Sequence, residues 1–264
     1  MVRMVEEHFA VVGGQRVRYL EVGSGWPVLL LHAFPMTVDM WRPQLERAPA
    51  GWRLVAPDVG ARPGAETIDA MAAGVLRLAD HLEIDRAVIG GLSMGGYVTF
   101  AAYRQAPERF AGMLLANTRS AADTPDGRNG RERMIALARE RGASAIADEM
   151  IPKLLGATSR RARPALLDEV RAIAESCAPD AIAGALAAMR DRPDSTPMLE
   201  RISCTTLVIG SDEDAVIPVA EVEQMQQRIP RSRLVVLRGA GHLSNLEAPD
   251  AFSKALTDFF ASRM

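Results

Sequence analysis

Six short apolar runs recur along the chain, and they constrain its fold more than any other feature. They lie at residues 28–32, 54–58, 87–91, 112–117, 205–210 and 233–239. Runs of this kind are typical of strands buried on both faces of a parallel sheet. Helical patterns separate them, at about 38–47, 66–82, 95–106, 218–229 and 247–262. The alternation predicts an α/β fold, with a mostly parallel central sheet and helices on both faces.

Two segments depart from this alternation. At the start, the alternating runs His8–Val12 and Arg16–Val22 flank Gly13-Gly14 and predict a β-hairpin. From residue 119 to about 195 there is no strand pattern, only stretches rich in Ala, Leu, Arg and Glu with helical periodicity. We therefore predict a core formed by 1–118 and 196–264, with a helical insertion at 119–195. Such an insertion would cover the strand ends, where open α/β sheets bind ligands.

Composition narrows the classes of partner. The chain has 264 residues, of which 48% are hydrophobic, and a net charge of -2. These values suit one large globular domain, or a domain with an insertion, and they argue against a disordered chain. No basic patch is interleaved with aromatic residues, so we expect no nucleic-acid partner. The apolar residues of the insertion would suit either a pocket lining or a homodimer interface.

The two cysteines and the N-terminus bear on the compartment. Cys177 and Cys204 form no metal-ligand spacing and are expected to be free thiols, as in a reducing compartment. The N-terminus lacks the apolar segment and cleavage site of a signal peptide, and no later run approaches a membrane-spanning length. We expect a cytoplasmic protein with no membrane partner.

One serine stands at a strand-to-helix junction in a run of small residues. Gly91-Leu92-Ser93-Met94-Gly95 matches the pattern G-x-S-x-G, with an apolar strand before it and a helix after it. The pattern suits a sharp turn that lifts a serine hydroxyl out of the sheet at a helix N-terminus, where developing negative charge is favoured. We predict that Ser93 is a nucleophile; the alternative is a tight turn with an incidental serine.

A serine nucleophile needs a base, and the chain has four histidines to supply one. His8 lies in the first strand and His81 near the end of a helix, where surface or packing roles are expected. His242 follows the last strand and precedes the last helix, in a loop that the small residues 239–241 allow to bend. We predict that His242 is the base.

The base in turn needs an orienting acid. Asp212 and Asp214 both follow the strand that ends at Gly210, so either carboxylate could reach His242. Asp214 is preferred because Ala-Val-Ile-Pro leads from it into a helix, and Asp212 then reads as a loop or capping residue. Glu213 reads as a solvated charge.

The order serine, acid, histidine, each at the end of its own strand, resembles that of the α/β-hydrolase superfamily, and the likeness extends over nearly the whole chain. The resemblance implies an α/β-hydrolase fold whose helical insertion is the cap domain. It also implies an oxyanion hole formed by the backbone N–H groups of Met94 and Phe34, the latter in the loop LLLHAFPM, which matches the family's H-G-x-P loop. His32 is then structural. We expect Phe34, Met94 and Leu243 to contact the substrate.

Some positions depart from the family's pattern or stay open. Ala33 stands where the family more often has glycine, and the loop at 57–69 is shorter than the Gly-rich loop of relatives. Lys153 and Arg119, in or beside the cap, could meet a substrate carboxylate or form ordinary ion pairs. Trp41 occupies a position that usually serves packing.

Two segments, HAFPMTVDMW and AGHLSNLEAPDAFSKALTDFF, resemble the 3-oxoadipate enol-lactonase and small-ester carboxylesterase group. The resemblance implies a serine hydrolase that cleaves a small ester or lactone through an acyl-enzyme, with no metal or organic cofactor. Two alternatives remain: a ligand receptor or regulator on this fold with very slow turnover, and an enzyme of the hydroxynitrile-lyase type that uses a cap lysine.

Overall fold

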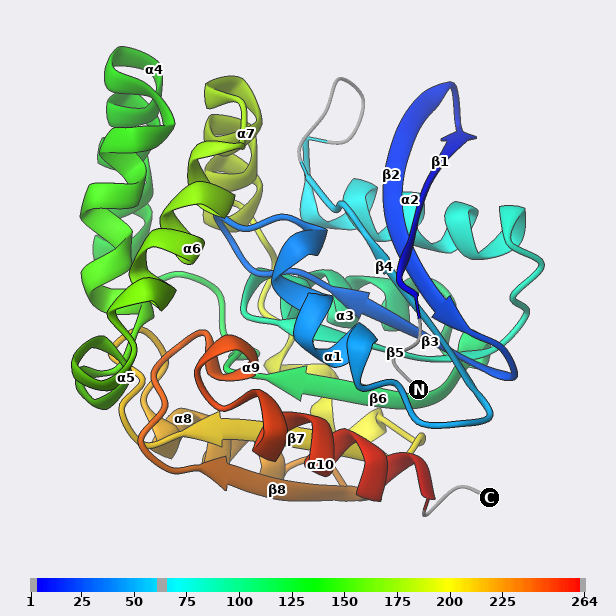
Figure 1. Cartoon of the computed structure of the whole chain (residues 1–264). Helices are drawn as coiled ribbons and strands as arrows, with labels where there is room; N and C mark the ends of the chain where they lie inside the picture. Colours follow the sequence, from blue (N-terminus) through cyan, green and yellow to red (C-terminus); the bar gives the residue numbers. More distant parts are fainter. Residues whose placement is uncertain (1–3, 61–65, 262–264) are drawn as a thin grey trace.

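The computed structural model describes residues 4–60 and 66–261. Within them a single eight-stranded sheet has the order β1-β2-β4-β3-β5-β6-β7-β8 (Figure 1). Its strands are β1 (Glu6–Val12), β2 (Gln15–Gly23), β3 (Trp26–Leu31), β4 (Trp52–Pro57), β5 (Ala87–Leu92), β6 (Phe110–Ala116), β7 (Thr206–Ser211) and β8 (Ser232–Leu237). Each predicted run overlaps one of these strands. The N-terminal hairpin is β1 paired with β2.

The sheet is mostly parallel, as the alternation predicts. β3 pairs in parallel with β4 and β5, and the series continues in parallel through β6, β7 and β8. The antiparallel pairs are β1 with β2 and β2 with β4. The carboxyl ends of β3 to β8 therefore meet at one edge of the sheet, where open α/β sheets bind their ligands.

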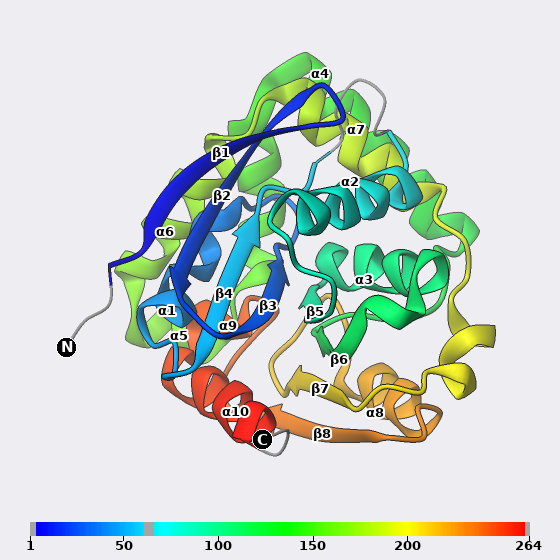
Figure 2. The same cartoon turned by 90° about the vertical axis from the view of Figure 1, so that its right-hand side faces the viewer.

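Helices cover both faces of the sheet (Figure 2). One face carries α2 (Ile68–His81), α3 (Met94–Gln105) and α8 (Val219–Gln227), and the other carries α1 (Arg42–Glu46) and α10 (Pro249–Ala261). Short elements connect them: η1 (Val38–Trp41), η2 (Pro107–Arg109), η3 (Thr196–Arg201) and α9 (Ser244–Glu247). A separate buried cluster fills each side, and Trp41 packs against Phe252 in the second of them.

Between β6 and β7 the chain forms the helical insertion, which we call the cap segment (residues 119–195). It contains α4 (Pro125–Leu154), α5 (Ala157–Ala162), α6 (Pro164–Glu175) and α7 (Pro179–Arg190), and α4 packs against both α6 and α7. Figure 1 shows these helices beyond the tips of the parallel strands. Within α4, Gly142 has φ +76°, which breaks the helix into two legs. The division of the chain into core and cap domains stays a prediction.

One predicted helix is divided in the structure, and another is preceded by a short separate helix. The pattern at 38–47 forms η1 and then α1, whereas the pattern at 247–262 forms α10, which follows the short helix α9. A proline lies in the first turn of each later helix, Pro43 in α1 and Pro249 in α10. Proline fits the first turn of a helix but removes a hydrogen bond from its interior, so a new helix begins at each of these residues.

Helix length and the cysteines complete the description of the fold. Among the described residues, no single helix is long and apolar enough to cross a membrane; α6 and α7 pass that test only together, as a pair bent by 92°. Cys177 and Cys204 are both free thiols, as predicted from their spacing. Cys204 is buried and Cys177 is partly buried.

Candidate active site

The turn at Ser93 is possible only because its neighbours lack side chains. Ser93 joins β5 to α3 with φ +54° and ψ -112°, a conformation that is uncommon outside glycine. A Cβ atom on Gly91 would lie 2.4 Å from the Leu31 carbonyl oxygen at the end of β3, and one on Gly95 would lie 2.1 Å from that oxygen. Both glycines of the G-x-S-x-G pattern are therefore required by the approach of β3 to the turn.

Hydrogen bonds hold the backbone of Ser93, whereas its hydroxyl has no hydrogen-bond partner among the residues that the structure describes. The Ser93 N–H donates to the Ala116 carbonyl oxygen (2.9 Å), and Thr118 Oγ1 donates to the Ser93 carbonyl oxygen (2.8 Å). Although Ser93 is the N-cap residue of α3, its side chain makes no capping hydrogen bond. The Ser93 side chain is thus fixed at the N-terminus of α3 with its hydroxyl available for chemistry.

His242 and Asp214 form a buried pair at the same edge of the sheet. His242 Nδ1 lies 2.9 Å from Asp214 Oδ2 and 3.1 Å from Oδ1, and both side chains are almost fully buried. Because a carboxylate accepts, Nδ1 carries the proton and Nε2 is left as the acceptor. Among the described residues, no hydrogen bond joins Ser93 Oγ to His242; such contacts often form only when substrate is bound.

Several donors keep Asp214 ionised. Its Oδ1 accepts from the N–H groups of Val216 (2.8 Å) and Ile217 (2.9 Å), and its Oδ2 accepts from Asn117 Nδ2 (2.9 Å). Burial alone would raise the pKa of Asp214, but the charge of His242 and these hydrogen bonds outweigh it and hold the pKa below its ordinary value. The Asp214 side chain is therefore ionised at neutral pH and can accept from His242 Nδ1.

Asn117 is a site residue that sequence reasoning missed. It follows β6 with φ +43°, and its side chain is fully buried. Besides Asp214, its Nδ2 donates to Ser211 Oγ (2.6 Å), and its Oδ1 accepts from Ser244 Oγ (2.6 Å). Asn117 and the next residue, Thr118, thus connect the acid and the serine turn through two consecutive positions. The signal in the sequence was a polar residue directly after an apolar strand.

Replacing Asn117 with alanine is expected to lower both stability and turnover. Three buried polar groups would lose a partner, which costs about 1–3 kcal/mol, and alanine tolerates the positive φ less well than asparagine. Asn117→Gly separates these effects because it frees the backbone without restoring the amide. The stability measured by thermal unfolding, and the activity of the site, should rank the proteins wild type, glycine, alanine. A glycine variant equal to wild type would mean that the amide is dispensable.

The other predicted alternatives lie away from this pair. Asp212 is exposed and accepts from the Gly239 N–H (2.7 Å), which is a loop contact. His8 stacks on Tyr19 in the N-terminal hairpin, and His81 is exposed at the end of α2. His32 uses both ring nitrogens in the fold: Nδ1 is 2.9 Å from the Ala33 carbonyl oxygen, and Nε2 accepts from the Val59 N–H (2.9 Å).

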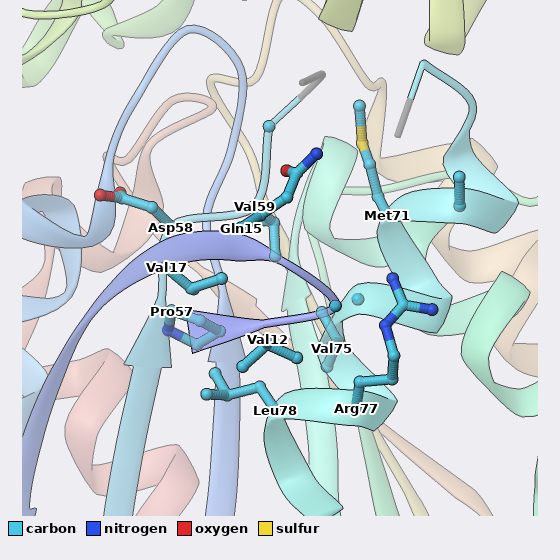
Figure 3. Close-up of a pocket in the computed structure, with 14 residues that line it drawn as sticks. Val12, Gln15, Val17, Pro57, Asp58, Val59, Met71, Val75, Arg77 and Leu78 are labelled. Carbon is cyan, nitrogen blue, oxygen red and sulfur yellow. The ribbon is translucent and has the colours of Figure 1, made fainter. Parts of the chain in front are cut away.

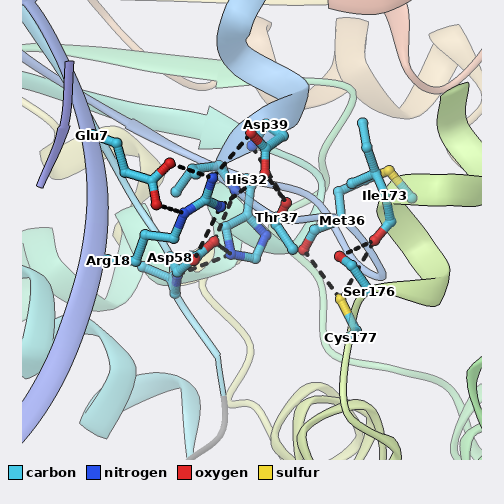
Figure 4. A network of polar contacts seen from close by, with 12 residues as sticks. Glu7, Arg18, His32, Met36, Thr37, Asp39, Asp58, Ile173, Ser176 and Cys177 are labelled. Carbon is cyan, nitrogen blue, oxygen red and sulfur yellow. Dashed lines mark hydrogen bonds and ion pairs between the residues drawn. The ribbon is translucent and has the colours of Figure 1, made fainter. Parts of the chain in front are cut away.

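A polar network holds the loop that follows β3 (Figure 4). Arg18 on β2 donates to both oxygens of Asp39 (2.8 and 3.1 Å), and Asp58 Oδ1 accepts from the Val38 N–H (2.8 Å). Burial would raise the pKa of Asp39, but the hydrogen bond and charge of Arg18 outweigh it and lower the pKa. The loop is therefore fixed from the core side by charge-assisted bonds.

From the cap side, Cys177 holds the same loop. Its Sγ donates to the Pro35 carbonyl oxygen (3.4 Å). Burial, with a smaller effect from the charge of Asp58, raises the pKa of the Cys177 thiol to about 11. The thiol thus stays protonated at neutral pH and acts as a weak donor rather than as a nucleophile.

The predicted oxyanion-hole donors are free, and Leu243 has another role. In the part of the chain that the structure describes, neither the Phe34 N–H nor the Met94 N–H is used in a hydrogen bond. Leu243 is fully buried in the cluster around α10, and its N–H donates to the Leu154 carbonyl oxygen (3.1 Å). The structure therefore places Leu243 in the core beside the site, and not on the wall of the cavity described next.

A cavity of about 190 Å³ adjoins the serine turn. The core contributes Phe34 and Met94, the two predicted oxyanion-hole residues, and the cap contributes side chains from the start of α7. The full lining comprises His32, Phe34, Pro35, Met36, Thr37, Asp58, Val59, Gly60, Met94, Cys177, Ala181, Ile182 and Ala185. It is mostly apolar and smaller than the roughly 300–1,000 Å³ of pockets for drug-sized ligands. Its size and lining suit a short apolar group.

A second hollow, of about 220 Å³, lies between the N-terminal hairpin and α2 (Figure 3). Apolar side chains such as Val12, Val17, Val75 and Leu78 line it, with Arg77 on α2. The linings of the two cavities have only Asp58, Val59 and Gly60 in common, and the second hollow contains none of the predicted catalytic residues. We therefore do not treat it as the active site.

The remaining predicted positions are accounted for as follows. Lys153 pairs with Glu149 (2.5 Å), and Arg119 donates to the Val216 carbonyl oxygen (2.8 Å) and lies 3.4 Å from Glu221. Part of the shortened loop at 57–69, residues 61–65, lies outside the described residues. Among the residues described, no cluster of three His, Cys, Asp or Glu side chains could hold a metal ion.

Fold and site together define an α/β protein whose polar residues meet at the carboxyl edge of a parallel sheet, under a helical cap segment. The model of the "Alpha/beta hydrolase family" matches residues 28–255. The chain belongs to this family, and the predicted α/β-hydrolase fold is confirmed.

Individual relatives are consistent with this family. A thermophilic esterase from Thermogutta terrifontis has a TM-score of 0.92 and 35% identity, covering 98% of this chain and 99% of its own. The enol-lactonase from Burkholderia xenovorans LB400 has a TM-score of 0.88 and 28% identity, covering 96% and 100%. The sequence of 3-oxoadipate enol-lactonase 2 from Acinetobacter baylyi is 29% identical over 83% of this chain and 82% of its own. The resemblance to esterases and enol-lactonases that the sequence predicts is thus confirmed.

Proposed function

We propose that the protein is a serine hydrolase that cleaves a small carboxylic ester or lactone. The observation that carries the proposal is the meeting of the strained Ser93 turn with the His242–Asp214 pair, through Asn117 and Thr118. Relatives that are esterases and enol-lactonases support an oxygen ester as the scissile bond.

In the proposed first half-reaction, Ser93 Oγ attacks the substrate carbonyl while its proton passes to His242 Nε2. Asp214 holds the imidazole in the required tautomer and stabilises its positive charge. The free N–H groups of Phe34 and Met94 are the proposed donors to the oxyanion of the tetrahedral intermediate, where each such donor is worth about 10²–10³ in rate. The bond to the leaving oxygen then breaks, and His242 returns the proton to that oxygen.

In the second half-reaction, a water molecule gives its proton to His242 and attacks the acyl carbon. Collapse of the second tetrahedral intermediate releases the acid and returns the proton to Ser93. In a lactone the leaving alcohol and the acid belong to one molecule, so the product is a single hydroxy acid. These steps require only groups of the protein and water.

The cavity beside Phe34 and Met94 is proposed to hold the acyl group. Its apolar lining favours a hydrocarbon, and its volume of about 190 Å³ favours a short one. The experiment that tests the function is hydrolysis of p-nitrophenyl acetate, butyrate and octanoate, together with a small lactone followed by acid release. We expect turnover of the short esters or the lactone; no turnover of any of the four would contradict the proposal.

Filling the cavity is expected to change the preference among acyl chains. Ala181 on α7 lines it, and Ala181→Leu would place a branched side chain in the space. We expect the ratio of kcat/KM for acetate to that for butyrate to rise about tenfold, the scale of one or two methylene groups in an apolar pocket. The matched control is Ala187→Leu, on the same helix but outside the lining. If the ratio is the same in both variants, the cavity does not bind the acyl group.

A further inference from the structure

A short part of the cap segment lies between the loops that carry Asp214 and His242. We call residues 154–158 the junction segment, because they join α4 to α5. At one end, the Leu243 N–H donates to the Leu154 carbonyl oxygen (3.1 Å). At the other end, the Thr158 N–H donates to Glu213 Oε2 (2.8 Å). The junction segment is thus hydrogen-bonded to Leu243, which follows His242, and to Glu213, which precedes Asp214.

Two carboxylates that the proposed chemistry does not use hold this segment. Glu213, directly before Asp214, accepts from the Thr158 hydroxyl as well (2.5 Å). Glu247, on α9 after His242, accepts from the Gly156 N–H through Oε2 (2.7 Å). Glu213, which the sequence suggests is a solvated charge, is partly exposed and is also hydrogen-bonded to the cap.

The backbones in this region are packed without space for a side chain. A Cβ atom on Gly156 would lie 2.6 Å from Glu213 Oε2 and 2.8 Å from the Gly241 nitrogen. A Cβ atom on Gly241 would lie 2.3 Å from the Gly156 nitrogen. The junction segment therefore abuts the residue directly before His242, and any displacement of the segment would be transmitted to the histidine loop.

We propose that Glu213 and Glu247 are positioning residues that clamp the junction segment between the two loops and so fix Asp214 and His242 relative to each other. The loops also contact directly, since the Glu213 N–H donates to the Ala240 carbonyl oxygen (3.0 Å). The cap segment is then part of the catalytic framework and not only a cover. The consequence for turnover rests on the proposed function; the clamp itself does not.

The surroundings of Glu247 determine which substitution can keep its hydrogen bond with the Gly156 N–H. Burial raises the pKa of Glu247 above its ordinary value, and donors on Gly241, Ser159 and Gly156 and the charge of His242 only partly oppose this. Arg163 binds the Leu246 and Glu247 carbonyl oxygens and not the carboxylate. A glutamine, neutral and of the same size, keeps an oxygen that accepts from the Gly156 N–H, whereas an alanine removes it.

The kinetic test compares Glu247→Ala, Glu247→Gln and the control Glu149→Ala, an exposed glutamate on α4. In Glu247→Ala we expect kcat for p-nitrophenyl butyrate to fall about tenfold to 100-fold with little change in KM, because displacing catalytic groups by about 1 Å has effects of this size. Glu247→Gln should recover most of the loss, and Glu149→Ala should match wild type. Gly156→Ala, which separates the segments sterically, should reproduce the fall in kcat.

The second readout is hydrogen–deuterium exchange, which does not require turnover. Peptides covering 239–248 should exchange faster in Glu247→Ala and Gly156→Ala than in wild type or Glu149→Ala, because the Leu243 N–H loses its protection. Unchanged exchange, or a glutamine variant as impaired as the alanine variant, would overturn the clamp. If wild type shows no turnover that depends on Ser93, the proposed function fails and exchange alone decides the clamp.

Discussion

Replacing Ser93 with alanine is expected to reduce kcat/KM for p-nitrophenyl butyrate by about 10⁴-fold or more, the scale seen when the nucleophile of a triad is removed. The loss is large because no other group in the turn can form the acyl-enzyme. Some turnover above that of water would remain, because the Phe34 and Met94 N–H groups and the cavity are unchanged.

The same substitution should leave the fold intact. Ser93 makes no side-chain capping bond, so alanine removes an oxygen without orphaning a partner among the described residues. The turn depends on Gly91 and Gly95 and on the backbone bond to Ala116, all of which remain. The melting temperature should therefore stay close to that of wild type, and a large fall would mean that activity was lost through unfolding.

A matched serine provides the control for this prediction. Ser253 on α10 has a buried Oγ that no described residue contacts by a hydrogen bond, and it lies outside the site. Ser253→Ala should hydrolyse the ester at the wild-type rate. A fluorophosphonate probe should label wild type and Ser253→Ala but not Ser93→Ala. Turnover or labelling that survives in Ser93→Ala would remove Ser93 from the mechanism.

The parts of this fold that follow from local sequence could be predicted. Strands buried on both faces leave short apolar runs, and G-x-S-x-G records a local steric requirement around Ser93. The break in α4 at Gly142 falls where the sequence separates one helical stretch, at 131–142, from the next, at 143–156. By contrast, Asp214 was only preferred over Asp212 in the sequence, and the contact with His242 distinguishes them.

The residues that support the site could not be predicted, because their roles depend on which strands are neighbours. Asn117 reaches Asp214 only because β6 lies beside β7, and Thr118 reaches Ser93 only because β6 lies beside β5. The sequence suggests only a surface charge at Glu213, because its hydrogen-bond partner Thr158 lies 55 positions earlier in the chain. Non-local contacts of this kind leave no pattern in a single sequence.

The second large effect is expected for Asp214→Asn, with a loss of about 10⁴-fold in kcat/KM. Asp214 accepts from four donors: the Val216 and Ile217 N–H groups, Asn117 Nδ2 and His242 Nδ1. An asparagine offers one oxygen in place of two. If that oxygen still accepts from the two backbone N–H groups, the amide NH₂ of the asparagine faces Asn117 Nδ2 and His242 Nδ1. Both of these groups are donors as well, so donor would face donor.

The mismatch would be relieved by moving the proton of His242 from Nδ1 to Nε2, so that Nδ1 accepts from the new amide. Nε2 would then be a donor and could no longer take the proton of Ser93, which is why the expected loss of activity is much larger than the loss of one hydrogen bond. The control Asp212→Asn keeps an oxygen for the Gly239 N–H in an exposed loop and should retain wild-type activity. The opposite result, an inactive Asp212→Asn beside an active Asp214→Asn, would exchange the two assignments.

Stability should depend on pH in a way that identifies the same carboxylate. The pKa of Asp214 is lower in the folded protein than its ordinary value, so the folded state favours the ionised form. The resulting stabilisation is present above the unfolded pKa of about 3.9 and is lost as pH falls through the lower folded pKa. Unfolding by urea should therefore show Asp214→Asn less stable than wild type at neutral pH, with the difference shrinking below about pH 4. Because Asp212 is exposed and its carboxylate accepts from a loop N–H, Asp212→Asn should change the stability little at neutral pH.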